Sequence, residues 1–255
     1  IKMVAAFETG FHQTIADAEK LYAIPTEWTR KFGVRKYGFH GASHRFIATR
    51  MSELLKNSEA KIVSCHLGGS SSVCAIRACK SVATSMGMSP QSGLPNNNRV
   101  GDFDVFALPV ILRGTGKTLA QVLDDLANRS GLLGLSGFND IRDIEAAAAK
   151  HDAGAQAALD VFIASVRHYL GAYLLLLGGA DAIVFTGGIG ENSVRMREEV
   201  CRNLEWFGIR IDPVKNKSVK GEARFDAADS RVQLWTMPTN EEIVVARQTA
   251  EKLRG

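Results

Sequence analysis

Two short apolar runs that flank a Gly/Ser-rich turn constrain the fold of this chain more than any other feature. The runs cover residues 61–65 and 72–77, and Gly68-Gly69-Ser70-Ser71 lies between them. Apolar runs of this length around a short glycine turn are typical of a β-hairpin. Two further runs, residues 182–185 and 232–235, predict two more strands.

Most of the remaining chain is predicted to be helical or to form loops. The predicted helices are residues 26–32, 43–55, 106–113, 118–129, 141–150, 155–177, 194–207 and 240–253. Residues 2–7 are apolar and predict one more strand, which ends near Glu8. Residues 84–104 have no periodicity and predict a long loop of the kind that usually carries function. Strands that alternate with helices predict an α/β fold.

The composition is that of a folded globular chain. It has 255 residues, of which 45% are hydrophobic and 23% charged, and its formal net charge is +4. These values exclude a disordered tail, a collagen-like repeat and a disulfide scaffold. A net charge this small, without a run of five like charges, does not indicate a nucleic-acid partner.

We also predict no membrane partner and a cytoplasmic location. The most apolar stretch, residues 169–185, is interrupted by Gly178-Gly179 and Asp181, which leaves it too short to cross a bilayer. The four cysteines form no C-x-x-C pair, so we interpret them as reduced and mostly buried thiols.

Two glycine-rich segments are candidates for binding phosphate. In residues 66–72, glycines would let backbone N–H groups approach an anion, and serines would add hydroxyl donors. The alternative is a merely flexible hairpin turn. Residues 185–192 place glycines between a strand and a helix, where N–H donors suit a nucleotide. The alternative there is a tight structural turn.

Three polar segments are candidates for other roles. His40 and His44 indicate an active-site loop or structural histidines, and the glycine between them argues against a zinc site. Arg99 is a candidate anion clamp, or the partner of Asp102 in a surface salt bridge. Glu241 either belongs to a simple helix cap or holds Mg²⁺.

Taken in order, these segments resemble the acetate kinase family, the acetate and propionate kinases. The matching motifs are Phe7-x-Thr-x-Phe-His12, Tyr37-Gly-Phe-His-Gly-x-Ser-His44, His66-Leu-Gly68, Thr84-Ser-Met-Gly87, Gly93-Leu94, Arg99-x-Gly-Asp102, Ser130-Gly-Leu-Leu-Gly134, Asp140-Ile-Arg142, Gly188-Ile-Gly-Glu-Asn192 and Pro238-Thr-Asn-Glu-Glu242. Each motif alone is weak, but the collinear set is specific.

The resemblance implies a ribonuclease H-like fold of the actin, Hsp70 and sugar kinase type. It implies reversible transfer of the ATP γ-phosphoryl group to acetate or propionate, which gives an acyl phosphate and ADP. Mg²⁺ or Mn²⁺ is the implied cofactor, ATP or ADP and a small carboxylate are the implied substrates, and a homodimer is the implied assembly. A related kinase for butyrate or another substrate, or a nucleotide-binding module inactive on its own, are the alternatives.

The resemblance also assigns site residues. It implies that the catalytic residues are His40, Arg99 and Glu8, with His44 as a supporting histidine, that Phe39 and Pro90 line the acyl pocket, and that Glu241 binds the metal. The implied ATP-binding residues are His66, Leu67, Gly68, Gly69, Ser70, Asp140, Ile141, Arg142, Gly188, Ile189, Gly190, Glu191 and Asn192.

The chain departs from the family pattern in three places. Glu8 replaces an aspartate, Gly69-Ser70 replaces an Asn-Gly pair, and residues 95–98 replace a segment with Met followed by Gly-Thr.

The resemblance further predicts that the chain is the C-terminal portion of a longer enzyme. Residues 1–12 would be a remnant of an N-terminal acyl-substrate domain, residues 13–238 the nucleotide-binding domain, and residues 239–255 a terminal helix that returns toward the first domain. The apolar residues 3–7 and the terminal helix would face the missing domain.

Overall fold

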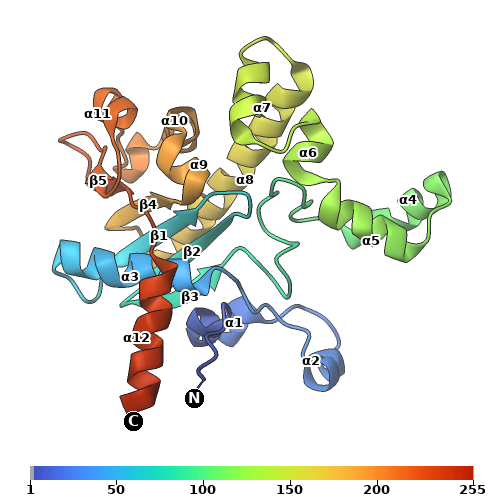
Figure 1. Ribbon diagram of the computed structural model, residues 1–255, viewed down its shortest axis with the longest axis horizontal. Helices are drawn as coiled ribbons and strands as arrows, with labels where there is room; N and C mark the ends of the chain where they lie inside the picture. Colours follow the sequence, from blue (N-terminus) through green and yellow to red (C-terminus); the bar gives the residue numbers. More distant parts are fainter. Residues whose placement is uncertain (1–2, 255) are drawn as a thin grey trace.

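A six-stranded mixed sheet forms the centre of the computed structural model, which describes residues 3–254 (Figure 1). The strand order is β3-β2-β1-β4-β6-β5. Strands β1, β4 and β6 run parallel, whereas β1–β2, β2–β3 and β5–β6 pair antiparallel. The strands are β1 (Lys61–His66), β2 (Ser72–Arg77), β3 (Lys80–Thr84), β4 (Ala182–Thr186), β5 (Ala223–Arg224) and β6 (Gln233–Thr236).

Helices cover both faces of this sheet. The α-helices are α1 (Asp17–Lys20), α2 (Thr26–Phe32), α3 (Gly41–Leu55), α4 (Leu108–Thr115), α5 (Leu119–Asn128), α6 (Gly131–Ser136), α7 (Ile141–Ala148), α8 (Ala153–Leu177), α9 (Gly187–Asn192), α10 (Val194–Cys201), α11 (Pro213–Ser218) and α12 (Glu241–Arg254). Three short 3₁₀ helices are η1 (Gly10–Thr14), η2 (Val105–Ala107) and η3 (Glu205–Phe207).

The sheet separates two apolar cores. The larger core joins one face of the sheet to α7, α8 and α10, with Phe162, Phe185 and Phe225 among its buried side chains. The smaller core joins the opposite face to α3 and η1 through residues such as Ile47 and Met51. Burial of large apolar side chains on both faces fixes the sheet, and therefore fixes the loops at its edge.

The hairpin prediction is confirmed, and β3 was missed for a physical reason. The β2–β3 connection is a two-residue turn made of Ala78 and Cys79, because Arg77 pairs directly with Lys80. Both turn residues have positive φ angles, 51° and 58°. Such turns usually contain glycine or asparagine, so this one lacks the usual sequence signal.

Three other predictions were wrong in detail. Residues 3–7 form no strand, because they pair with no neighbour in the sheet and Met3 and Phe7 are exposed. The predicted helix 194–207 ends at Cys201, since Asn203 adopts a left-handed φ of 59° that stops it. The glycine loop after β4 is instead the short helix α9. Residue 2 lies outside the described residues.

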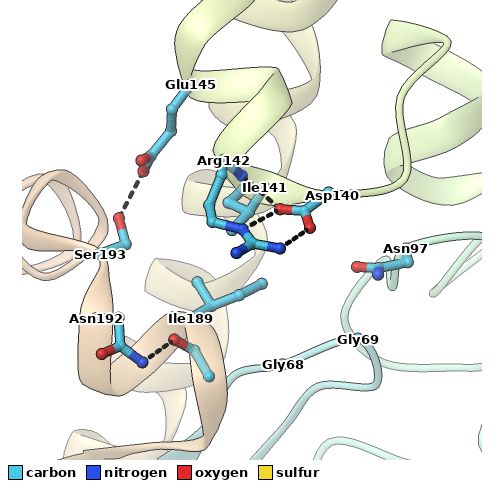
Figure 2. Close-up of a pocket in the computed structure, with 11 residues that line it drawn as sticks. Gly68, Gly69, Asn97, Asp140, Ile141, Arg142, Glu145, Ile189, Asn192 and Ser193 are labelled. Carbon is cyan, nitrogen blue, oxygen red and sulfur yellow. Dashed lines mark hydrogen bonds and ion pairs between the residues drawn. The ribbon is translucent and has the colours of Figure 1, made fainter.

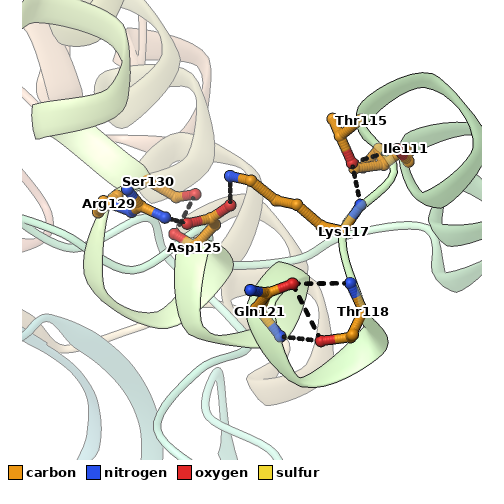
Figure 3. A network of polar contacts seen from close by, with 8 residues as sticks. All are labelled: Ile111, Thr115, Lys117, Thr118, Gln121, Asp125, Arg129 and Ser130. Carbon is orange, nitrogen blue, oxygen red and sulfur yellow. Dashed lines mark hydrogen bonds and ion pairs between the residues drawn. The ribbon is translucent and has the colours of Figure 1, made fainter.

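Helices α4 and α5 project from the body of the molecule as an arm (Figure 1). The predicted cap of α5 is confirmed, because Thr118 and Gln121 form a reciprocal capping box (Figure 3). At the base of the arm, Asp125 pairs with both Lys117 and Arg129. These charges brace the arm, whose side chains Phe106 and Val110 remain exposed.

Helix α8 is long and apolar enough, by length and composition alone, to cross a bilayer. Ten of its side chains are buried, however, and they pack into the larger core against the sheet. This arrangement is that of a core helix followed by the buried strand β4, as the sequence predicted. All four cysteines are free; Cys65, Cys74 and Cys201 are buried and Cys79 is exposed.

Candidate active site

The glycine turn between β1 and β2 meets the first turn of α9 at one edge of the sheet. Parallel pairing of β1 with β4 places these two segments side by side. Leu67 N donates to the Thr186 carbonyl at 2.8 Å, and Ile189 N donates to the Leu67 carbonyl at 2.9 Å. The Leu67 side chain is fully buried. Leu67 therefore holds the two glycine segments together instead of facing the site.

A cavity of about 470 Å³ lies between these segments and the start of α7 (Figure 2). Its lining residues are Gly68, Gly69, Asn97, Asp140, Ile141, Arg142, Glu145, Gly188, Ile189, Asn192 and Ser193. Eight of these were predicted to bind ATP, so the fold brings three distant segments of the chain together. The predicted residues His66, Leu67, Ser70, Gly190 and Glu191 flank this group without lining the cavity.

One rim of the cavity is formed by the start of α7. Asp140 caps this helix by accepting from Arg142 N, and its carboxylate also forms two hydrogen bonds with the Arg142 guanidinium, at 2.9 and 2.5 Å. The side-chain hydrogen bond from Arg142 lowers the pKa of Asp140 to about 2. Across the cavity, Ser193 Oγ donates to Glu145 at 2.5 Å. Fixed polar groups thus surround an opening floored by Ile189 and Ile141.

Four histidines gather beside the glycine turn. The rings of His40 and His66 stack with their centroids 4.3 Å apart, and His44 and His12 lie next to them. Ser72 Oγ lies 2.9 Å from His40 Nδ1 and 2.8 Å from His44 Nε2. Because one hydroxyl has one proton, Ser72 donates to one ring and accepts from the other, which couples their tautomers.

Burial keeps these histidines neutral. It lowers the pKa of His12 and of His66 to about 4, and it lowers the pKa of His44 well below its usual value. Burial, followed by the nearby His66, lowers the pKa of His40 to about 3, and Arg99 contributes in the same direction. No group of three or more metal-ligating side chains occurs among residues 3–254, so these rings form a hydrogen-bonding cluster.

His40 is held in an unusual backbone conformation. It precedes α3 with φ 56° and ψ 30°, in the left-handed region that non-glycine residues rarely adopt. Strained backbone of this kind persists where the surrounding structure fixes it, and it is common at functional sites. The stacking on His66 and the hydrogen bond to Ser72 are the contacts that fix it here.

Arg99 reaches the same place from the long loop. Its guanidinium donates to Ser70 Oγ at 3.1 Å, directly beside the glycine turn. The alternative pairing with Asp102 does not occur, because Asp102 instead accepts from Gly93 N and from the Tyr169 hydroxyl. A permanent cation next to neutral histidines gives the site a focused positive charge.

Glu8 and Glu241 approach this site from the two ends of the chain. The Glu8 carbonyl accepts from Gly41 N at 3.0 Å, and a Cβ on Gly41 would lie only 2.1 Å from that oxygen. Glycine therefore permits residue 8 to approach the histidine loop. Burial, with the charge of Glu8, raises the pKa of Glu241. Asn240 caps α12 through its side chain, which decides between the two predicted caps.

Comparisons with known proteins agree with this arrangement. The family model described as the acetokinase family matches residues 1–247. The chain belongs to the acetokinase family. It is 44% identical over 252 residues to acetate kinase of Shouchella clausii, which covers 98% of this chain and 64% of that protein. It is also 44% identical to acetate kinase of Bacillus subtilis, over 97% of this chain and 63% of that protein.

Solved structures of the acetokinase family have the same fold. A Porphyromonas gingivalis acetate kinase superposes with a TM-score of 0.93 at 36% identity, over 97% of this chain and 63% of that one. A Francisella tularensis propionate kinase gives 0.90 at 36% identity, over 95% and 62%. The predicted fold class is confirmed. The chain spans less than two thirds of the length of the relatives described here.

The residues of this acetokinase-family chain fit the divalent cation that the family implies. Glu8 and Glu241 are hard oxygen donors that repel each other, as the raised pKa of Glu241 indicates. Thr239 Oγ1 is buried without a hydrogen-bond partner among the described residues. Mg²⁺ is usually held by one or two carboxylates together with substrate phosphates, so this donor set suits it.

Sequence reasoning missed three cavity residues, Asn97, Glu145 and Ser193. Glu145 and Ser193 come together only because α7 packs beside the α9–α10 junction, a contact that no local pattern shows. Phe39 and Pro90 are half-buried, and the Phe39 carbonyl accepts from His12 while the Pro90 carbonyl accepts from Asn96. Their assignment to an acyl pocket stays a prediction.

Proposed function

We propose that the protein to which this chain belongs transfers the ATP γ-phosphoryl group to a short-chain carboxylate, acetate or propionate, and forms an acyl phosphate and ADP reversibly. One observation supports this most strongly. The 470 Å³ cavity opens beside Gly68 and Gly69, and the same glycine turn contacts Arg99 and the neutral histidines. A nucleotide site and a charge-stabilising site therefore share one turn.

We assign ATP to the cavity, with its phosphates toward the glycine turn. Backbone N–H groups of Gly68 and Gly69 would donate to phosphate oxygens, since glycine allows close approach. The apolar side chains of Ile141 and Ile189 would contact the adenine, and the Asp140–Arg142 pair would form the outer rim. This orientation directs the terminal phosphate to Arg99 and His40.

Arg99 and His40 have different tasks in this proposal. Arg99 would neutralise charge on the phosphoryl group in flight through its planar guanidinium. His40, which stays neutral because burial lowers its pKa to about 3, would donate a hydrogen bond and add no charge. The carboxylate of the acceptor attacks phosphorus, the bond to the ADP oxygen breaks, and no proton has to move.

Glu241 and Glu8 would hold Mg²⁺ or Mn²⁺ beside the phosphate chain. The bound cation supplies charge neutralisation for the phosphates of ATP. Glu8 is longer than the aspartate of the family pattern, and we propose that Gly41 compensates by anchoring the backbone of residue 8 close to His40. The test is the Mg²⁺ dependence of activity, given among the predictions below.

We further propose a cytoplasmic homodimer. The arm of α4 and α5 exposes Val105, Phe106, Val110, Leu119 and Leu123. An apolar arm of this kind suits contact with a second copy. Sedimentation equilibrium of wild-type protein and of the Phe106→Asp variant would test it, because a monomeric wild type would refute a homodimer. The two-domain division of the longer enzyme, with residues 1–12 and 239–255 contacting the first domain, is likewise a proposal.

Acyl phosphate formation tests the proposed reaction directly. The full-length protein is incubated with Mg²⁺, ATP and acetate, propionate, butyrate or a sugar, and hydroxylamine traps the acyl phosphate while ADP release is followed. We expect ADP and hydroxamate in equal amounts with acetate or propionate. ADP release with a sugar but with no carboxylate would refute the proposal.

A further inference from the structure

Asn97 occupies the space beside Gly69 that a longer side chain at residue 69 would need. A Cβ placed on Gly69 would lie 3.4 Å from Asn97 Nδ2, which is ordinary contact, and no other neighbour comes within 4 Å except Cγ of the same residue. A larger side chain on Gly69 would thus meet the Asn97 amide. Asn97 also lines the nucleotide cavity together with Gly68 and Gly69 (Figure 2).

The backbone fixes Asn97 in this position from both sides. Asn97 N donates to the Gly69 carbonyl at 3.2 Å, and the Asn97 carbonyl accepts from Leu133 N at 2.8 Å. The neighbouring Asn96 is fully buried, and its Oδ1 accepts from Ser71 N at 2.6 Å. These bonds tie the long loop to the glycine turn, so the Asn97 side chain starts from a rigid base.

The Asn97 amide itself is not committed to the protein. Its Oδ1 is buried and has no hydrogen-bond partner among the described residues. Buried polar atoms are nearly always paired, so an orphaned one beside a cavity indicates a group that arrives with the ligand. The amide nitrogen, which lies against Gly69, is the donor end, and phosphate oxygens only accept.

The departures from the family pattern point the same way. The glycine turn lacks the asparagine of that pattern, and the loop before Arg99 has asparagines where the pattern has Gly-Thr. Asparagine and glycine are thus exchanged between two loops that touch each other. A side-chain amide is lost from one wall of the contact and gained on the opposite wall.

We propose that Asn97 donates its side-chain amide to the phosphate chain of the bound nucleotide, in place of the amide absent from residue 69. This inference rests on the proposed ATP site. It names a binding residue that approaches the phosphates from the Arg99 loop and not from the hairpin. Because Asn97 lies two residues before Arg99, phosphate binding and placement of the Arg99 cation become linked.

The test compares nucleotide affinity in the full chain by calorimetry, with ATP and with adenosine as probes. The Asn97→Gly variant should bind ATP about tenfold more weakly and adenosine as tightly as wild type. Asn97→Asp, which keeps the shape and adds negative charge, should lose more affinity for ATP than Asn97→Gly. Asn98→Gly is the matched control for loop flexibility, and it should leave both affinities unchanged.

The exchange variant makes the inference sharper. Gly69→Asn combined with Asn97→Gly should recover most of the ATP affinity lost in Asn97→Gly, whereas Gly69→Asn alone should not bind ATP better than wild type. Wild-type ATP affinity in Asn97→Gly, or an equal loss for adenosine, would overturn the role of Asn97 and leave the ATP site standing. Absence of ATP binding by the wild-type chain would overturn the proposed ATP site and this inference together.

Discussion

Replacement of His12 by glutamine should make the stability of this protein less sensitive to acid. His12 is 3% exposed, and both ring nitrogens have partners, Ser81 Oγ at 2.8 Å and the Phe39 carbonyl at 2.9 Å. Burial is the main reason that its pKa falls from 6.5 to about 4. Glutamine retains an amide donor and acceptor at this position and does not titrate.

The sign and size follow from proton linkage. Between about pH 6.5 and pH 4 the unfolded chain binds a proton at His12 and the folded chain does not. Stability from the neutral ring is therefore complete above pH 6.5 and is lost as the pH falls toward 4. At ~1.4 kcal/mol for each pH unit, the loss from this one residue amounts to ~3 kcal/mol.

Urea unfolding at a series of pH values measures this effect. The free energy of unfolding is obtained from tryptophan fluorescence between pH 7.5 and pH 4.5 for wild type and for His12→Gln. The wild type should lose ~3 kcal/mol more than the variant across this range, whatever their difference at pH 7.5. His168→Gln, which replaces an exposed histidine of α8, should keep the wild-type slope. Equal slopes for wild type and His12→Gln would refute the reasoning.

Three further predictions concern the site. Arg99→Ala in the full-length protein should lower turnover about 100-fold or more, whereas Arg113→Ala on the arm should not change it; equal turnover would remove Arg99 from the site. Glu241→Gln should raise the Mg²⁺ concentration for half-maximal activity roughly tenfold, as a titration will show. Gly131→Ala should cost about 2–3 kcal/mol in urea unfolding, because its φ is 61° and the new Cβ would lie 2.1 Å from a carbonyl oxygen of the long loop; Gly171→Ala, with open space around it, should cost nothing.

Much of the fold could be predicted because the signals are local. The runs 61–65, 72–77 and 182–185 are apolar at strand length, and all three form strands of the central sheet. Thr118 caps α5 as its spacing with Gln121 predicts. The turn at Ala78-Cys79 and the end of α10 at Asn203 could not be predicted, because non-glycine residues adopt positive φ there only in the folded context.

The sequence by itself determined which segments could carry chemistry, since glycine, histidine and arginine at motif spacing are visible without coordinates. Tertiary structure alone decided how they meet. Parallel pairing of β1 with β4 joins two glycine segments more than a hundred residues apart, and burial makes His40 and His66 neutral neighbours of Arg99. The contact of Asn97 with Gly69 is of the same kind. Proximity and dielectric environment depend on packing, and packing is not written in any local pattern.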